Sequence, residues 1–287
     1  MITTLRRACF VGILLLTVPS GNLVALSPEK SSVSLFVKDA LTAPGQPVTI
    51  EAKLVEKRVL TSMPRGGEPL ELVIEGQVVA TTMTGVDGRG FLTYLPKKQA
   101  LVPIEVRVGD SPRVQSTTAQ ANLAVWEKRQ PILLVELSAL VDEAAPGRAP
   151  SIGVGLSSER QAIPEASDEL AKLTQFYYRI IYVVTVPAGG DGAQVSAEVR
   201  TWLKTKKFPM GYVMAISPDT KVLGTKLDEF HAAGWKTVKV GVGRSKDFAE
   251  VFLQRRLDAI MVPEPSKGDV PRKAKVAKDW KEVRKKL

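Results

Sequence analysis

The chain has 287 residues, of which 44% are hydrophobic and 24% charged, a composition typical of globular proteins that excludes wholesale disorder. Its formal net charge of +10 favours anionic partners such as phosphorylated ligands, lipid headgroups or acidic polymers, and we expect no specific nucleic-acid partner. One Cys and one His exclude nearly every Cys/His metal site and the usual catalytic triads.

Residues 1–27 have the pattern of a secretory signal peptide. Arg6 and Arg7 precede an apolar run over 10–18 that is too short to span a bilayer. Three positions suit cleavage: Ser20, Ala25 and Ser27. Removal of two arginines and no acid lowers the formal charge from +10 to +8 and also removes the single Cys. The sequence therefore predicts an extracytoplasmic protein, periplasmic or secreted, without disulfides. A buried amino-terminal helix is the alternative interpretation of this segment.

Residues 28–128 are predicted to form an all-β, immunoglobulin-like sandwich. Seven apolar or alternating runs, separated by Gly, Pro and Asp turns, cover 32–37, 47–55, 70–74, 78–83, 90–95, 103–108 and 118–125. Strands at this spacing are typical of an antiparallel β-sandwich. The turn over 84–90 resembles that of bacterial immunoglobulin-like modules, and the resemblance implies a supporting domain without a site of its own.

Residues 129–287 are predicted to form a Rossmann-like α/β domain. Compact apolar strands are expected over 132–135, 179–184, 211–216, 237–241 and 259–262. Each is followed by helical periodicity, over 168–177, 193–206, 223–234, 247–256 and 271–287. Alternating strands and helices predict a parallel sheet covered on both faces, with ligands at the carboxyl ends of the strands.

Three segments in this domain, 198–203, 208–218 and 242–247, resemble the haloacid dehalogenase (HAD) superfamily of phosphotransferases, with weaker support from 170–173. The closest likeness is to lipin-type phosphatidate phosphatase domains. The resemblance implies a HAD-like fold that opens with a nucleophilic Asp, a general acid/base Asp two residues later, and a Thr two further on. In this chain the three positions are Glu136, Ser138 and Leu140.

Those replacements predict a degenerate catalytic motif. Neither covalent phosphoryl capture nor protonation of a leaving group has its expected residue. We therefore expect a non-catalytic, phosphatase-like binding or scaffold protein with no cofactor, or with weakly bound Mg²⁺. The alternative is a divalent-metal-dependent phosphatase, similar to phosphatidate phosphatases, that holds a cation between Glu136 and Asp247.

The resemblance also implies an anion site for a phosphate-bearing ligand or lipid headgroup. Thr185 stands where the family has its phosphate-binding hydroxyl, and Lys226, or otherwise Lys221, where it has a charge-neutralising lysine. Plainer roles are open: Thr185 as a strand residue, Lys226 as a solvated helix residue, and Asp247 as a helix cap. Glu136 is harder to explain in this way, because a buried carboxylate needs a partner.

Two further segments bear on function. The Pro- and Gly-rich stretch over 141–167 is too short for a cap domain and predicts a small flap beside an open mouth. From residue 267 onward nine basic residues face three acidic ones, and the apolar residues in this stretch follow a helical stripe. This pattern favours a last helix docked on the sheet, with peripheral membrane contact through 271–287 as the alternative.

Overall fold

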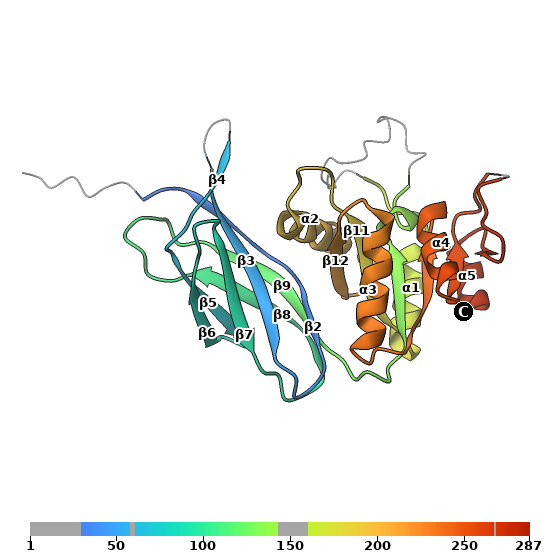
Figure 1. Ribbon diagram of the computed structural model, residues 1–287, viewed down its shortest axis with the longest axis horizontal. Helices are drawn as coiled ribbons and strands as arrows, with labels where there is room; N and C mark the ends of the chain where they lie inside the picture. The colour runs from blue at the N-terminus through green and yellow to red at the C-terminus, as the bar shows by residue number, and fades with distance from the viewer. Residues whose placement is uncertain (1–29, 58–60, 143–159, 267) are drawn as a thin grey trace, which may run out of the picture.

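The computed structural model of the protein describes residues 30–57, 61–142, 160–266 and 268–287 (Figure 1). The predicted signal peptide lies outside these residues. The described chain forms a β-sandwich followed by an α/β domain, and residues 126–131 connect the last sandwich strand to the first strand of the parallel sheet. Within the described ranges no helix has the length and apolar character needed to cross a membrane.

The sandwich contains nine strands in the described part of the chain. They are β1 (Val33–Val37), β2 (Ala40–Thr42), β3 (Val48–Lys57), β4 (Ser62–Pro64), β5 (Pro69–Ile74), β6 (Gln77–Met83), β7 (Arg89–Tyr94), β8 (Ala100–Val108) and β9 (Thr118–Val125). In one sheet β3 pairs with β1, β4 and β7, and the other sheet has the order β2-β9-β8-β5-β6. Alternate residues such as Ile50, Leu72 and Leu123 point inward and form the core.

Seven of these strands match the predicted runs, and β2 and β4 are additions. The prediction of a wholly antiparallel sandwich is wrong at one place, because β2 pairs with β9 in parallel. Both additional strands are three residues long. An alternating pattern cannot be recognised over so few residues.

The α/β domain is built on a six-stranded parallel sheet with the order β12-β11-β10-β13-β14-β15. Its elements are β10 (Ile132–Glu136), the 3₁₀ turn η1 (Leu137–Ala139), α1 (Ala166–Phe176), β11 (Arg179–Thr185), α2 (Gly192–Thr205), β12 (Tyr212–Ile216), α3 (Thr220–Ala232), β13 (Val238–Gly243), α4 (Lys246–Gln254), β14 (Asp258–Met261), β15 (Lys275–Val276) and α5 (Trp280–Lys286). The chain enters at the central strand β10 and reverses direction across the sheet after β12. This order is that of a doubly wound, Rossmann-like sheet.

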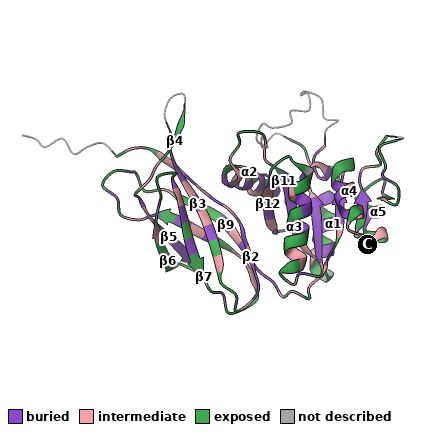
Figure 2. Ribbon diagram, viewed as in Figure 1, coloured by how far each residue is buried: buried purple, intermediate pink, exposed green. Residues whose placement is uncertain are grey.

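Both faces of the sheet are covered. Leu133 and Val135 of β10 share a core with α1, α2 and α5, whereas Leu134 shares a core with α3 and α4. The strands are accordingly buried while the outer surface of α3 is exposed (Figure 2). A strand buried on both faces needs a continuous apolar run rather than an alternating one, which is why β10 reads Ile-Leu-Leu-Val.

The carboxyl-terminal segment departs from its predicted single helix over 271–287. Helix α5 covers only the last part, because Lys275–Val276 instead forms β15 beside β14. Trp280 and Val283 are buried, and the indole N–H of Trp280 donates to the carbonyl of Ala139 at 3.0 Å. The apolar stripe is thus packed inside the domain.

A buried ion pair joins the two domains. The Asp39 side chain, between β1 and β2, is 0% exposed and accepts from Arg200 of α2 at 2.7 Å. Asp39 also accepts from the backbone N–H of Asn122 and of Val213, at 2.8 Å each. Arg200 further donates to backbone carbonyls in β1 and β9, at 2.9 and 2.7 Å. Since a buried charge is costly unless it is paired and hydrogen-bonded, these contacts fix how α2 sits against the sandwich.

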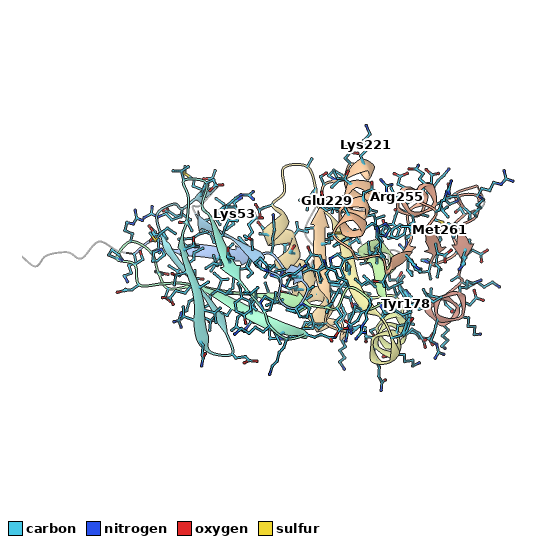
Figure 3. All side chains as sticks on the ribbon, turned by 60° about the horizontal axis from the view of Figure 1, so that its bottom comes forward. Lys53, Tyr178, Lys221, Glu229, Arg255 and Met261 are labelled. Carbon is cyan, nitrogen blue, oxygen red and sulfur yellow. The ribbon has the colours of Figure 1, made fainter. Side chains whose placement is uncertain are left out.

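A second interdomain ion pair links Lys53 of β3 to Asp191, at 2.6 Å (Figure 3 labels Lys53). Asp191 is also the N-cap of α2 and accepts from the N–H groups of Ala193 and Gln194. Burial acts to raise the pKa of Asp191, but the hydrogen bonds from Lys53 and from the helix N–H groups outweigh burial and hold this pKa below its ordinary value.

Replacing Arg200 with Ala should lower the free energy of unfolding by about 3–5 kcal/mol, because Asp39 would stay buried without its cation. Urea denaturation at neutral pH measures this loss. Arg107→Ala serves as the control, since it removes an exposed pair with Glu71 that is worth at most about 1 kcal/mol. An equal decrease in the free energy of unfolding in the two variants would show that the buried pair stabilises the fold no more than the exposed pair does.

Asp191→Asn should retain the capping oxygen of α2 but remove the charge that attracts Lys53. The pKa of Asp191 is lowered in the folded protein, so its charge stabilises the fold above the unfolded pKa of about 3.8. That contribution is lost as the pH falls through the folded pKa. We therefore expect the wild-type protein to be the more stable at neutral pH, with the difference vanishing in strong acid. Urea titrations over a pH series test this, and a pH-independent difference would contradict it.

Candidate functional site at the carboxyl edge of the parallel sheet

The carboxyl ends of β10 and β13 lie side by side where the strand order of the sheet reverses. The loops that follow these strands diverge to opposite faces of the sheet. Open α/β sheets bind their ligands at this place. Here it is formed by Glu136, the last residue of β10, and by Arg244 and Ser245, which follow β13.

The Glu136 carboxylate is held by three donors from the loop after β13. Its Oε2 accepts from the backbone N–H of Arg244 at 2.8 Å and of Ser245 at 2.9 Å, and its Oε1 accepts from the Ser245 hydroxyl at 2.6 Å. Gly243 makes this approach possible, because a β-carbon there would lie 2.7 Å from Oε2. Both carboxylate oxygens are therefore engaged within the protein. We call this set of contacts the Glu136–Ser245 contact.

Ser245 connects this contact to α4. It is the N-cap of that helix, and its Oγ accepts from the N–H of Phe248 at 3.2 Å while donating to Glu136. The carboxylate of Glu136 thus lies beside the amino end of α4, where the helix dipole favours negative charge. The guanidinium of the adjacent Arg244 donates to the carbonyl of Val141 at 3.0 Å, which ties the segment after η1 to the same loop.

The other two positions singled out by the family resemblance, Ser138 and Leu140, offer little to a ligand. Ser138 lies in η1, and its Oγ is buried without a hydrogen-bond partner among the described residues. Leu140 is fully buried and belongs to the core shared with α1 and α2. Of the predicted flap, the structure describes only the two ends, where Val141 and Ala162 form an antiparallel bridge. The stretch 143–159 lies outside the described residues.

The predicted anion-binding residues lie at or near the same edge but apart from the Glu136–Ser245 contact. Thr185 ends β11 and is exposed, and Lys221 is exposed in the first turn of α3, pointing away from the molecule (Figure 3). Lys226 lies further along α3, where it forms an ion pair with Glu229 at 2.6 Å.

Asp247, the second predicted metal ligand, is exposed in the first turn of α4. The cap of that helix is Ser245. Nowhere in the described residues do three or more His, Cys, Asp or Glu side chains gather so as to hold a metal ion. A magnesium site needs carboxylate oxygens that are free to coordinate, and three of the roughly four acceptor positions of the Glu136 carboxylate are used by N–H and O–H donors. The residues at this edge do not fit Mg²⁺.

Sequence reasoning did not single out Arg244 or Ser245 as partners of Glu136. One signal was available for Ser245, because a Ser directly after an apolar strand and before a helical segment is a typical N-cap. No comparable signal exists for the contact itself.

A scan against protein-family models found no match to the chain, and a search of curated proteins found none either. Among solved structures, the chain is similar to a D,D-heptose 1,7-bisphosphate phosphatase from Burkholderia thailandensis, with 14% identity, 55% of this chain and 97% of that chain covered, and a TM-score of 0.38. It is also similar to titin domain M7, with 14% identity, 35% and 99% coverage and a TM-score of 0.26. These are weak structural similarities.

Replacing Glu136 with Ala should lower the free energy of unfolding by at least about 2 kcal/mol, because two N–H groups and a hydroxyl lose a charged acceptor. Hydrogen exchange should show faster exchange at the amides of Arg244 and Ser245 in particular. The matched control is Glu198→Ala, which removes a carboxylate whose one hydrogen bond within the described residues comes from the exposed side chain of Gln194. Unchanged amide protection in Glu136→Ala would refute the structural role of this carboxylate.

Proposed function

We propose that the protein is an exported, non-catalytic binding or scaffold protein, in which a degenerate, HAD-like phosphatase domain is attached to an immunoglobulin-like sandwich. The observation that carries this proposal is the Glu136–Ser245 contact. A residue at the nucleophile position of such a domain needs a free carboxylate oxygen to attack phosphorus. In this chain that residue instead bonds the β13–α4 loop to β10.

The neighbouring positions support the same proposal. A general acid is worth about 10²–10⁴-fold in rate, and Ser138 cannot supply a proton to a leaving group at neutral pH. Leu140 is part of the core and has no polar group to offer. A phosphoryl group at this edge would therefore contact exposed surface residues rather than a catalytic pair of carboxylates.

The ligand we propose for this edge is a phosphate-bearing anion or a lipid headgroup. Thr185 and Lys221 are exposed there and could contact it, while the backbone donors at the start of α4 are occupied by Glu136. Any contact of 271–287 with an anionic membrane would be electrostatic, since the apolar residues of α5 are packed inside the domain. Export is proposed from the signal-like residues 1–27 and is tested by the amino-terminal sequence of the secreted product.

The purified protein should hydrolyse neither a generic phosphomonoester nor phosphatidate, with or without Mg²⁺, and Glu136→Ala should behave in the same way. Release of inorganic phosphate measures this. The competing proposal is a divalent-metal-dependent phosphatase that uses Glu136. Metal-dependent turnover of about 1 s⁻¹ that disappears in Glu136→Ala would establish that alternative.

A further inference from the structure

A groove of about 260 Å³ lies where the two domains meet, at the amino ends of β11 and β12. Leu101 of β8 and Trp126 of the connecting segment line it from the sandwich side. The α/β domain contributes the end of α1, the start of β11 and the residues before β12. The groove is therefore at the opposite edge of the sheet from Glu136, and both domains are needed to form it.

Six of the nine residues that line the groove are apolar or aromatic. Its apolar lining consists of Leu101, Trp126, Tyr178, Ile180, Pro209 and Met210. Tyr178 is also packed edge-to-face against Tyr177, with ring centroids 5.1 Å apart, and this contact limits the positions that its ring can adopt (Figure 3 labels Tyr178). Met210 is 47% exposed, although a large apolar side chain gains from burial. A bound ring would cover this surface.

Two donors of the groove residues, the Nη groups of Arg179 and the indole N–H of Trp126, have no side-chain or backbone acceptor among the described residues. Arg179 donates through Nε to the side chain of Gln130 at 3.2 Å, but it forms no ion pair with any residue in the described ranges. The Nη groups of a guanidinium are a rigid fork that suits a carboxylate. Trp126 is 1% exposed, and its indole N–H has no hydrogen-bond partner within the described chain. Buried donors are nearly always satisfied, so the indole N–H of Trp126 is an exception among the described residues.

Size narrows the choice of ligand. Sites for drug-sized ligands measure about 300–1,000 Å³, and this groove lies just below that range. A cavity of about 150 Å³ is enough for benzene. The groove therefore suits one ring with a short charged substituent, and it is too small for a nucleotide or a polymer segment.

We propose that this interdomain groove binds a small aromatic carboxylate, with its ring against Tyr178 and Met210 and its carboxylate on Arg179. Such a ligand contacts both domains and so stabilises their docking. The site is independent of the function proposed for the carboxyl edge, because it shares no residue with it.

Benzoate is the probe, and the full chain labelled with ¹³C in its Met methyl groups is the sample. Titration should shift the Met210 methyl signal saturably, because a ring bound in the groove lies against it. Met63 and Met83 are similarly exposed, at 45% and 57%, but lie on the sandwich away from the groove, so their signals should stay unchanged. Benzyl alcohol, which has the same ring without the charge, should bind about tenfold more weakly.

Arg179→Gln should weaken benzoate binding about tenfold and leave benzyl alcohol binding unchanged, since one charge-assisted interaction is removed. Arg272→Gln, at an exposed arginine outside the groove, is the matched control and should change neither. If Arg179→Gln does not fold, Arg179→Lys keeps the charge, loses the bidentate geometry, and should show a smaller weakening. No saturable shift at Met210, equal shifts at all exposed methionines, or equal binding of the two probes would each overturn the proposal.

Discussion

The geometry of the α/β domain depends on how one carboxylate is satisfied at the point where the sheet reverses its strand order. Helix amino ends and unpaired N–H groups collect at this place and attract an anion. In this chain the anion is Glu136, covalently part of the central strand. A free phosphate would have to lose its translational freedom to bind, whereas Glu136 is already in position. Glu136 therefore binds these N–H groups more favourably than a free phosphate would. Its hydrogen bonds link β10 to the loop before α4.

The second constraint is the polar seam between the domains. Asp39 and Arg200 are buried together, and Asn122 of β9 adds a bond from its side-chain amide to the carbonyl of Gly211 at 2.9 Å. Hydrophobic packing alone tolerates sliding, but these directional bonds are satisfied in only one relative orientation. The short connection over 126–131 also restricts the relative motion of the two domains. Together they hold the walls of the interdomain groove, which come from both domains, at a defined separation.

Much of the fold could be predicted from local pattern, because long apolar strands and amphipathic helices carry their own period. The run at 132–135 and the helix near 193–206 are examples. Elements of two or three residues, such as β2, β4 and β15, are too short to show a hydrophobic period in the sequence. They form because a neighbouring strand pairs with them. The helix predicted over 271–287 was too long for the same reason. Lys275 and Val276 fit a helical pattern in the sequence, and only their pairing with β14 makes them a strand.

The candidate site was less predictable than the fold. The sequence pointed to Glu136 as a carboxylate that needs a partner, but the partner lies 108 and 109 positions later and arrives only because β13 pairs beside β10. Asp39 and Arg200, 161 positions apart, are hidden from local pattern in the same way. Contacts of this separation follow from the order in which the strands pair, which local sequence pattern does not reveal.

The two edges of the parallel sheet thus differ in a way that the fold alone does not reveal. At the carboxyl edge, where such sheets usually bind ligands, the nearest anion-binding donors are already bonded to Glu136. The hydroxyl of Ser138 has no partner among the described residues, but it is buried from solvent. At the amino edge, Arg179 forms no ion pair within the described residues and lies beside an apolar groove. Binding free energy comes from groups that gain partners, and groups that already have partners must first lose them. By that criterion the amino edge has more to gain from a ligand than the carboxyl edge, although open parallel sheets usually bind ligands at the carboxyl edge.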